Sequence, residues 1–117
     1  MTLTEMVKAL RDVTKAEAAA VISRDGGVLA AELPPSVSQE TFSIMCAAIL
    51  GAGLTASTEL RHKPPRRVVL DSEDSTIVIQ EIGRRAMVVL VLPPDVPLDR
   101  LEGVLRRFSE SAGAALS

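Results

Sequence analysis

The most distinctive pattern in the chain is a run of 18 residues without charge, residues 41–58, which reads TFSIMCAAILGAGLTAST between Glu40 and Glu59. Ser36 or Ser38 can cap a helix at its start, because a serine side chain accepts hydrogen bonds from first-turn amides. We therefore expect one helix over residues 38–60, about 35 Å long at 1.5 Å per residue.

Projected at helical spacing, the apolar and small side chains of this helix form two neighbouring stripes. The first stripe is expected to cover a sheet and consists of Phe42, Met45, Cys46, Ile49, Gly53, Ala56 and Leu60. The second would let another backbone come close and consists of Ile44, Ala48, Gly51, Ala52 and Thr55. Because a glycine inside a helix costs about 1 kcal/mol relative to alanine, the two glycines in these stripes call for a packing reason.

Two other interpretations of the same run stay open at this point. The small stripe could accommodate a neighbouring helix of the same chain. The run could also cross a membrane, which takes about 20 mainly apolar residues. We disfavour the membrane because many positions are Ser, Thr, Gly or Ala, and because the flanking sequence predicts strands that need a common core.

The remaining elements follow from periodicity and turn signals. Apolar spacing predicts a helix over residues 3–14, opened by a capping box of Thr2 and Glu5, and a final helix from about Leu98 with a frayed tail after Gly113. Strands are predicted at 18–23, 28–33, 67–71, 76–82 and 86–92, separated by Gly- and Pro-containing turns. The last of these, AMVVLVL, lacks alternation and is expected to be covered on both faces.

The element order α-β-β-α-β-β-β-α predicts the fold class. We expect an α/β (α+β) protein, with residues 1–117 in a single domain. Its five-stranded antiparallel sheet would carry the long helix on one face and the terminal helices on the other.

Composition narrows the function classes. The 117 residues carry a net charge of −2 and include two Phe, no Trp and no Tyr, which argues against a nucleic-acid platform. The single cysteine, Cys46, excludes an internal disulfide and is expected to be a small buried hydrophobe, although a pair across a two-fold axis is conceivable. Residues 1–10 lack the apolar segment of a signal peptide, so a cytoplasmic protein is expected.

The sequence contains none of the catalytic motifs that can be recognised from residue spacing alone. There is no Walker-type phosphate loop, and one His with one Cys cannot form a common zinc site. We expect His62 and the acidic turn of Asp71, Glu73 and Asp74 to be solvated, and we expect no catalytic, metal or cofactor residue. The basic pairs Arg66-Arg67 and Arg84-Arg85 either protect strand edges or contact an acidic patch on a partner.

Four segments together resemble the roadblock / dynein light chain family. They are SRDGGVLAAELPP, SQETFSIMCAAILGAGLTASTEL, RRVVLDSEDSTIVIQEIG and AMVVLVLPPDVPLDRL. The resemblance covers nearly the whole chain, and the long helix and the segment PPRRVVLDSEDS are most similar to single-domain prokaryotic members, archaeal ones among them.

The resemblance implies a sheet between helices, related to the longin and profilin-like architectures. It implies dimers that pair the long second helix with its mate and join edge strands into one sheet. Many members bind or regulate small Ras-like GTPases, and others attach to dynein. The gliding-motility type remodels its GTPase without supplying an arginine finger, so the resemblance carries over surfaces and no catalytic atoms.

Carried onto this sequence, the resemblance and the small stripe predict a homodimer. The expected dimer interface is Ile44, Ala48, Gly51, Ala52, Thr55, Arg67, Val68 and Val69, and the expected partner contacts are Arg66, Arg84 and Arg85. The function expected is a non-enzymatic scaffold or regulator of a small Ras-like GTPase, with no nucleic acid and no membrane insertion.

The alternative is a sensor or adaptor for a small ligand or another signalling protein. A buried cavity, found without close packing of the long helix, would favour it. The third and least supported class is an enzyme, which hydrolysis of nucleotide by the isolated chain would reveal.

Overall fold

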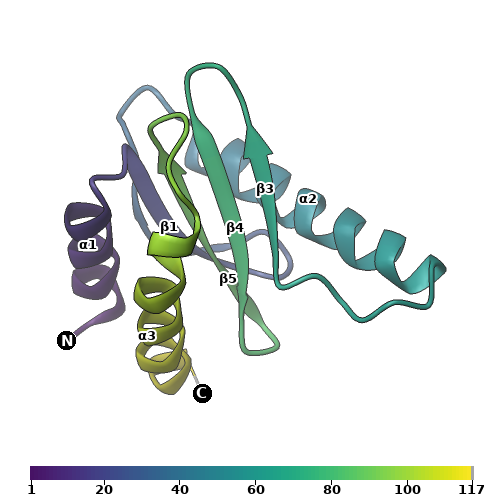
Figure 1. The fold of residues 1–117 in the computed structure, drawn as a ribbon. Coiled ribbons are helices and arrows are strands. Elements are labelled where there is room, and N and C mark those ends of the chain that lie inside the picture. Colours follow the sequence, from purple (N-terminus) through teal and green to yellow (C-terminus); the bar gives the residue numbers. More distant parts are fainter. Residues whose placement is uncertain (117) are drawn as a thin grey trace.

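The computed structural model describes residues 1–116, which form three helices and five strands in the expected order (Figure 1). The elements are α1 (Leu3–Thr14), β1 (Ala18–Ser23), β2 (Val28–Glu32), α2 (Gln39–Glu59), β3 (Arg67–Asp71), β4 (Thr76–Ile82), β5 (Ala86–Leu92) and α3 (Asp99–Leu116). The α-β-β-α-β-β-β-α prediction is confirmed.

All five strands join one antiparallel sheet in the order β2-β1-β5-β4-β3. The hairpins β1–β2, β3–β4 and β4–β5 connect sequence neighbours, and β1 pairs with β5 in a register that sets Ala20 opposite Val89. The edges of the sheet are therefore β2 and β3.

Helices cover both faces of the sheet, as Figure 1 shows: α1 and α3 lie in front of it and α2 lies behind it. Side chains of β5 alternate between the two layers. Val88 and Leu90 pack in the cluster that includes α1 and α3, while Met87 and Val89 pack in the cluster beneath α2. A strand buried from both sides has no polar face to show, which confirms the interpretation of AMVVLVL.

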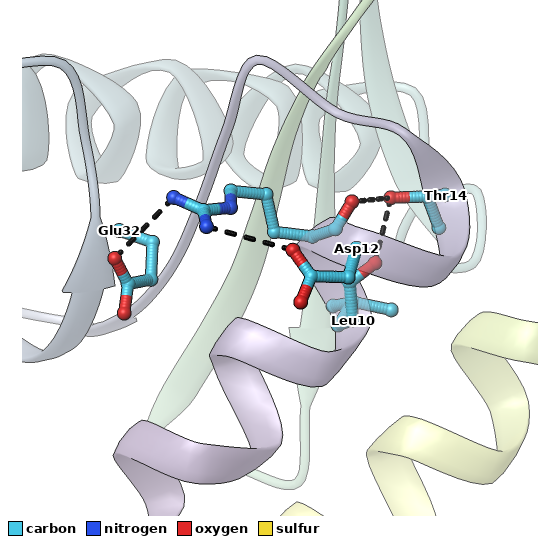
Figure 2. A network of polar contacts seen from close by, with 5 residues as sticks. Leu10, Asp12, Thr14 and Glu32 are labelled. Carbon is cyan, nitrogen blue, oxygen red and sulfur yellow. Dashed lines mark hydrogen bonds and ion pairs between the residues drawn. The ribbon is translucent and has the colours of Figure 1, made fainter.

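The helix α1 is fixed at both ends by polar contacts. At its start, the Thr2 N–H donates to Glu5 Oε1 at 2.9 Å and the Glu5 N–H donates to Thr2 Oγ1 at 3.1 Å, which is the predicted capping box. At its end, the Thr14 hydroxyl donates to the Leu10 carbonyl at 2.7 Å (Figure 2). The same view shows the Arg11 guanidinium reaching across to Glu32 of β2 at 3.4 Å.

Several boundaries differ from the sequence prediction. The helix α2 begins and ends one residue inside the predicted 38–60, and α3 begins at Asp99 instead of about Leu98. The second strand ends at Glu32, one residue short of the predicted Leu33, which directly precedes Pro34 and Pro35. The last helix continues through Gly113 to Leu116, whereas a frayed tail was predicted there. Ala112 is fully buried and Leu116 packs against the core, so tertiary contacts hold the final turns together. Ser117 lies outside the described residues.

Candidate functional site: an interaction surface on the long helix

The inner face of α2 is anchored to the sheet by three side chains that are almost fully buried. Cys46 and Leu50, at 3% and 0% exposure, enter the apolar cluster beneath the helix. Ser43, at 1% exposure, donates its hydroxyl to the Gly26 carbonyl at 2.7 Å. This bond ties the first half of α2 to the turn between β1 and β2, because a buried hydroxyl needs a partner.

The first predicted stripe is partly wrong. Phe42, Ile49 and Gly53 do face the sheet, but three other members of the stripe point to solvent: Met45 is 52% exposed, Leu60 is 66% exposed and Ala56 is exposed. Leu50 and Ser43, which the prediction left out, take their place on the inner face. A helix without charge over five turns carries no polar side that would mark its rotation, so periodicity alone could not orient it.

The two glycines of α2 have different surroundings. A Cβ added at Gly53 would lie 3.2 Å from Val68 Cγ2, so Gly53 is a point of close approach between α2 and β3. A Cβ added at Gly51 would meet no atom within 4 Å. The packing reason for Gly53 is therefore inside the chain, while Gly51 has none there.

The second predicted stripe forms the outer face of α2. All five of its residues are exposed, including Ile44 at 45%, and Met45 lies beside them. The alternative of a neighbouring helix from the same chain is wrong, because α1 and α3 both lie on the opposite face of the sheet (Figure 1). We define this uncharged, exposed set as the outer α2 face: Ile44, Met45, Ala48, Gly51, Ala52 and Thr55.

The composition of α2 also bears on the membrane interpretation. Within residues 1–116, α2 alone is long and apolar enough to cross a membrane by length and composition, so the composition argument against a span is weaker than expected. Only 17% of its apolar window is buried in the protein. In this fold its inner face is nevertheless occupied by the sheet, and what needs a partner is the outer α2 face.

The edge strand β3 borders this face. Val68 packs beneath α2, and Leu70, on the same side of the strand, is 36% exposed. Arg67 and Val69 point to the other side, where the Arg67 guanidinium pairs with Glu102 of α3 at 3.3 Å. Of the three strand residues predicted for the interface, only Val68 shares a side with α2. Leu70 was missed, although alternation from Val68 would have identified it.

Beyond β3, the helix continues without support. Figure 1 shows the C-terminal end of α2 extending past the edge of the sheet. This overhang explains the exposure of Leu60, and it leaves both the helix and the free β3 edge open to a second molecule.

The predicted contact arginines lie at one end of the sheet. Arg66 precedes β3, and Arg84 and Arg85 form the turn from β4 to β5, whose register places Ile82 opposite Ala86. All three are exposed, and within residues 1–116 none forms an ion pair. By contrast, the neighbouring Arg24 pairs with Glu81.

The other residues singled out for chemistry have ordinary surroundings. Burial raises the pKa of the Cys46 thiol to about 11, so the thiol stays protonated at neutral pH. It also lies on the inner face, which removes it from a disulfide across the outer one. His62 and the turn residues Asp71, Glu73 and Asp74 are exposed, as predicted. No group of His, Cys, Asp or Glu in the described part of the chain could hold a metal ion.

Comparison with known proteins places this geometry in context. The model of the Roadblock/LC7 domain matches residues 2–92. No curated protein has a matching sequence. Among solved structures, a Roadblock/LC7 domain from Streptomyces avermitilis superposes with a TM-score of 0.89 at 14% identity, over 99% of this chain and 98% of that one.

Two further structures share the fold. The gliding protein MglB from Thermus thermophilus has a TM-score of 0.79 at 24% identity, over 94% of this chain and 84% of its own. Profilin II from Acanthamoeba castellanii has a TM-score of 0.65 at 14% identity, over 99% of this chain and 100% of its own. These likenesses confirm the profilin-like architecture.

Proposed function

This chain belongs to the Roadblock/LC7 family, and we propose that it works as a homodimeric interaction module that binds a small Ras-like GTPase as a scaffold or regulator. The observation that carries the proposal is the outer α2 face, an exposed helical surface without charge that neither α1 nor α3 covers. Large apolar patches left open on a folded domain mark interaction sites.

Energetics favour burial of this face in a dimer. Full burial of a large apolar side chain contributes about 1.5–3 kcal/mol, and Ile44 and Met45 are each about half exposed. In a two-fold dimer each of these side chains is buried once in each subunit, so their contribution to the free energy of association is counted twice. From there toward the end of the helix, the small residues Ala48, Gly51 and Ala52 have no long side chains, so the backbones of two helices can approach closely.

The edge strand extends the same interface. With β3 at the border of the sheet, its free N–H and C=O groups can pair with the β3 of a second copy. Such pairing would continue the sheet across the two-fold axis, with Leu70 of each copy next to the paired helices. An interface of this kind uses the same patch on both subunits.

In this proposal the chain binds the GTPase but does not supply a catalytic group. A regulator of this kind acts by positioning the switch segments of the GTPase, which shifts that protein toward its hydrolytic state. Arg66, Arg84 and Arg85 are the cationic contacts we assign to an acidic surface of the partner, since their guanidinium groups have no acidic partner in the described chain. We further propose a cytoplasmic location for the pair.

Two measurements test the proposal. Light scattering at about 20 µM should give the mass of a dimer, and a monomer would overturn the dimeric part. Capture from native lysate with a non-hydrolysable GTP analogue should enrich a Ras-like protein, and equal recovery with GDP would argue against a nucleotide-dependent partner. Hydrolysis of GTP by the isolated chain would contradict the non-enzymatic assignment.

A further inference from the structure

A pocket of about 640 Å³ lies on the opposite side of the sheet from the outer α2 face. It sits where the C-terminal end of α3 meets the turn from β4 to β5, and its walls include Leu29, Ile82, Leu116, Gly113, Arg84 and Arg85. Its volume falls in the range of about 300–1,000 Å³ that is typical of small-molecule sites.

A bulge in β2 supplies one wall of this pocket. In the β1–β2 ladder, Val21 pairs with Ala30 and Ile22 pairs with Val28, so Leu29 has no partner in the register. A bulge of this kind redirects a side chain out of the regular alternation. Leu29 lines the pocket and is 45% exposed, although leucine gains by burial.

The floor of the pocket is also apolar. Ile82 and Ala86 form it as members of the core cluster, at 2% and 1% exposure, and Leu116 packs against that cluster from the end of α3, so Leu29 and Leu116 supply the accessible apolar surface. The two glycines of the wall, Gly83 and Gly113, would each place an added Cβ in open space. This part of the pocket can therefore hold an alkyl chain.

The positive charge lies on one side of the pocket. Arg84 and Arg85 are exposed and unpaired within residues 1–116, and no acidic side chain is among the residues that line the pocket. The Arg24 N–H donates to the Arg85 carbonyl at 2.9 Å, which holds the arginine turn against the neighbouring hairpin. Two guanidinium groups on a fixed turn are suited to binding a carboxylate, because each presents a planar set of donors.

We propose that this pocket binds a single-chain amphiphile with a carboxylate head. The head contacts Arg84 and Arg85, and the alkyl chain lies along Leu29 and Leu116, over the floor at Ile82. Because the proposed GTPase contact uses the same two guanidinium groups, the amphiphile and the acidic surface of the GTPase would compete for them. A peptide fits the site less well. Of the strands that border the pocket, β4 and β5 are interior with both neighbours paired, and only β2 has a free edge. The bulge at Leu29 interrupts the regular ladder of β2, which makes that edge a poor template for a peptide backbone.

The test is a titration of the ¹⁵N-labelled chain with decanoate below its micelle concentration. We expect saturable shifts of the amides of Gly83, Arg84, Arg85 and Gly113 with one equivalent per chain. Decanol, which has the same chain length but no charge, should bind at least about tenfold more weakly. Equal binding of the two probes, shifts confined to α2, or no saturable binding of decanoate would each overturn the proposal.

Variants separate the head from the chain. Replacing both arginines, Arg84→Gln with Arg85→Gln, should weaken decanoate about tenfold and leave decanol unchanged. Gly113→Leu should block both probes, because Gly113 lines the pocket and an added side chain meets no atom within 4 Å of its Cβ. Its control, Gly113→Ala, gives a similar gain in helix propensity with a single methyl group and should retain binding. Unchanged decanoate affinity in the double variant would contradict the role of the arginines. Tighter binding of an acidic leucine peptide than of decanoate would reassign the pocket to a protein partner.

Discussion

The two long helices, α2 and α3, lie on opposite faces of the same sheet but differ in what they show to solvent. The inner side of α3 is apolar, with Leu101, Leu105 and Phe108 buried, and its outer side carries the charges of Arg106, Arg107 and Glu110. α2 also buries apolar side chains against the sheet, yet its outer side has no charge from residue 41 to residue 58.

This difference between the outer sides of α2 and α3 distinguishes the surface that folding requires from the surface that association requires. Covering one face of a sheet requires a single apolar stripe, and α3 provides no more than that. The second apolar side of α2 contributes little to the packing of the chain on itself: Ile44 approaches the turn at Gly26, but the space at Gly51 is open. We therefore attribute the inner side of α2 to the fold and its outer side to a second molecule.

The sharpest way to break this comparison is to place a charge on each outer side. Ala48→Glu on α2 would bury an unpaired carboxylate at a dimer interface, at a cost of about 3–5 kcal/mol. The dissociation constant of the dimer should rise at least about 100-fold, which analytical ultracentrifugation can measure.

The matched control is Ser111→Glu on the exposed side of α3, which should leave the dimer unchanged. If Ala48→Glu stays dimeric with unaltered stability, the interface lies elsewhere. If both variants dissociate the dimer, the outer side of α3 also contributes to association, and the proposed difference between the two helices is wrong.

The second prediction compares the two sides of α2 itself, in the Ala48→Glu background so that association does not contribute. Gly53→Leu forces a side chain against Val68 and should lower the free energy of unfolding by about 1–3 kcal/mol. Gly51→Leu meets open space and improves helix propensity, so it should raise the same free energy by up to about 1 kcal/mol. Urea denaturation measures both.

Equal destabilisation by the two substitutions would show that Gly51 also packs inside the chain. A gain in stability from Gly53→Leu would show that β3 can shift to accommodate the larger side chain. The close approach at Val68 would then not restrict the residue at position 53.

Much of the fold could be predicted because its boundaries carry strong local signals. Four of the five strands begin and end where the sequence placed them, since turns such as the one at Asp25 and Gly26 interrupt the apolar runs. The outer α2 face could also be predicted, as the small stripe. Its rotation could not, so Met45 was assigned to the sheet and Leu50 was overlooked.

The pocket beside α3 lay beyond sequence reasoning for a different reason. Its walls come from residues far apart in the chain, Leu29 and Gly113 among them, and they meet only through the strand order of the sheet. The bulge that turns Leu29 toward it has no signature in the run VLAAE, which looks like an ordinary short strand. Arg84 and Arg85 stand out in the sequence as a basic pair, but the sequence gives no sign of the cavity beside them.

The smallest predicted effect concerns how helices on the two faces begin. α1 starts with the charged capping box of Thr2 and Glu5, whereas α2 starts with neutral Ser38, whose Oγ accepts from the Thr41 N–H at 3.3 Å. Hydrogen bonds from Thr2, first from its backbone and then from its side chain, lower the pKa of Glu5. A lowered folded-state pKa means that the contribution of Glu5 to stability is present above the ordinary carboxyl value of 4.5 and is lost as the pH falls through the folded-state pKa.

Glu5→Gln should therefore lower the thermal midpoint slightly at pH 7, and the difference from the parent should shrink as the pH is lowered below 4.5. Ser38→Ala, which removes about 1 kcal/mol of capping energy, should lower the midpoint by the same amount at both pH values, because no titrating group takes part. Thermal unfolding in the Ala48→Glu background measures both variants without a contribution from the dimer. A Glu5→Gln effect of undiminished size well below pH 4.5 would mean that the charge of the carboxylate is not what stabilises the start of α1.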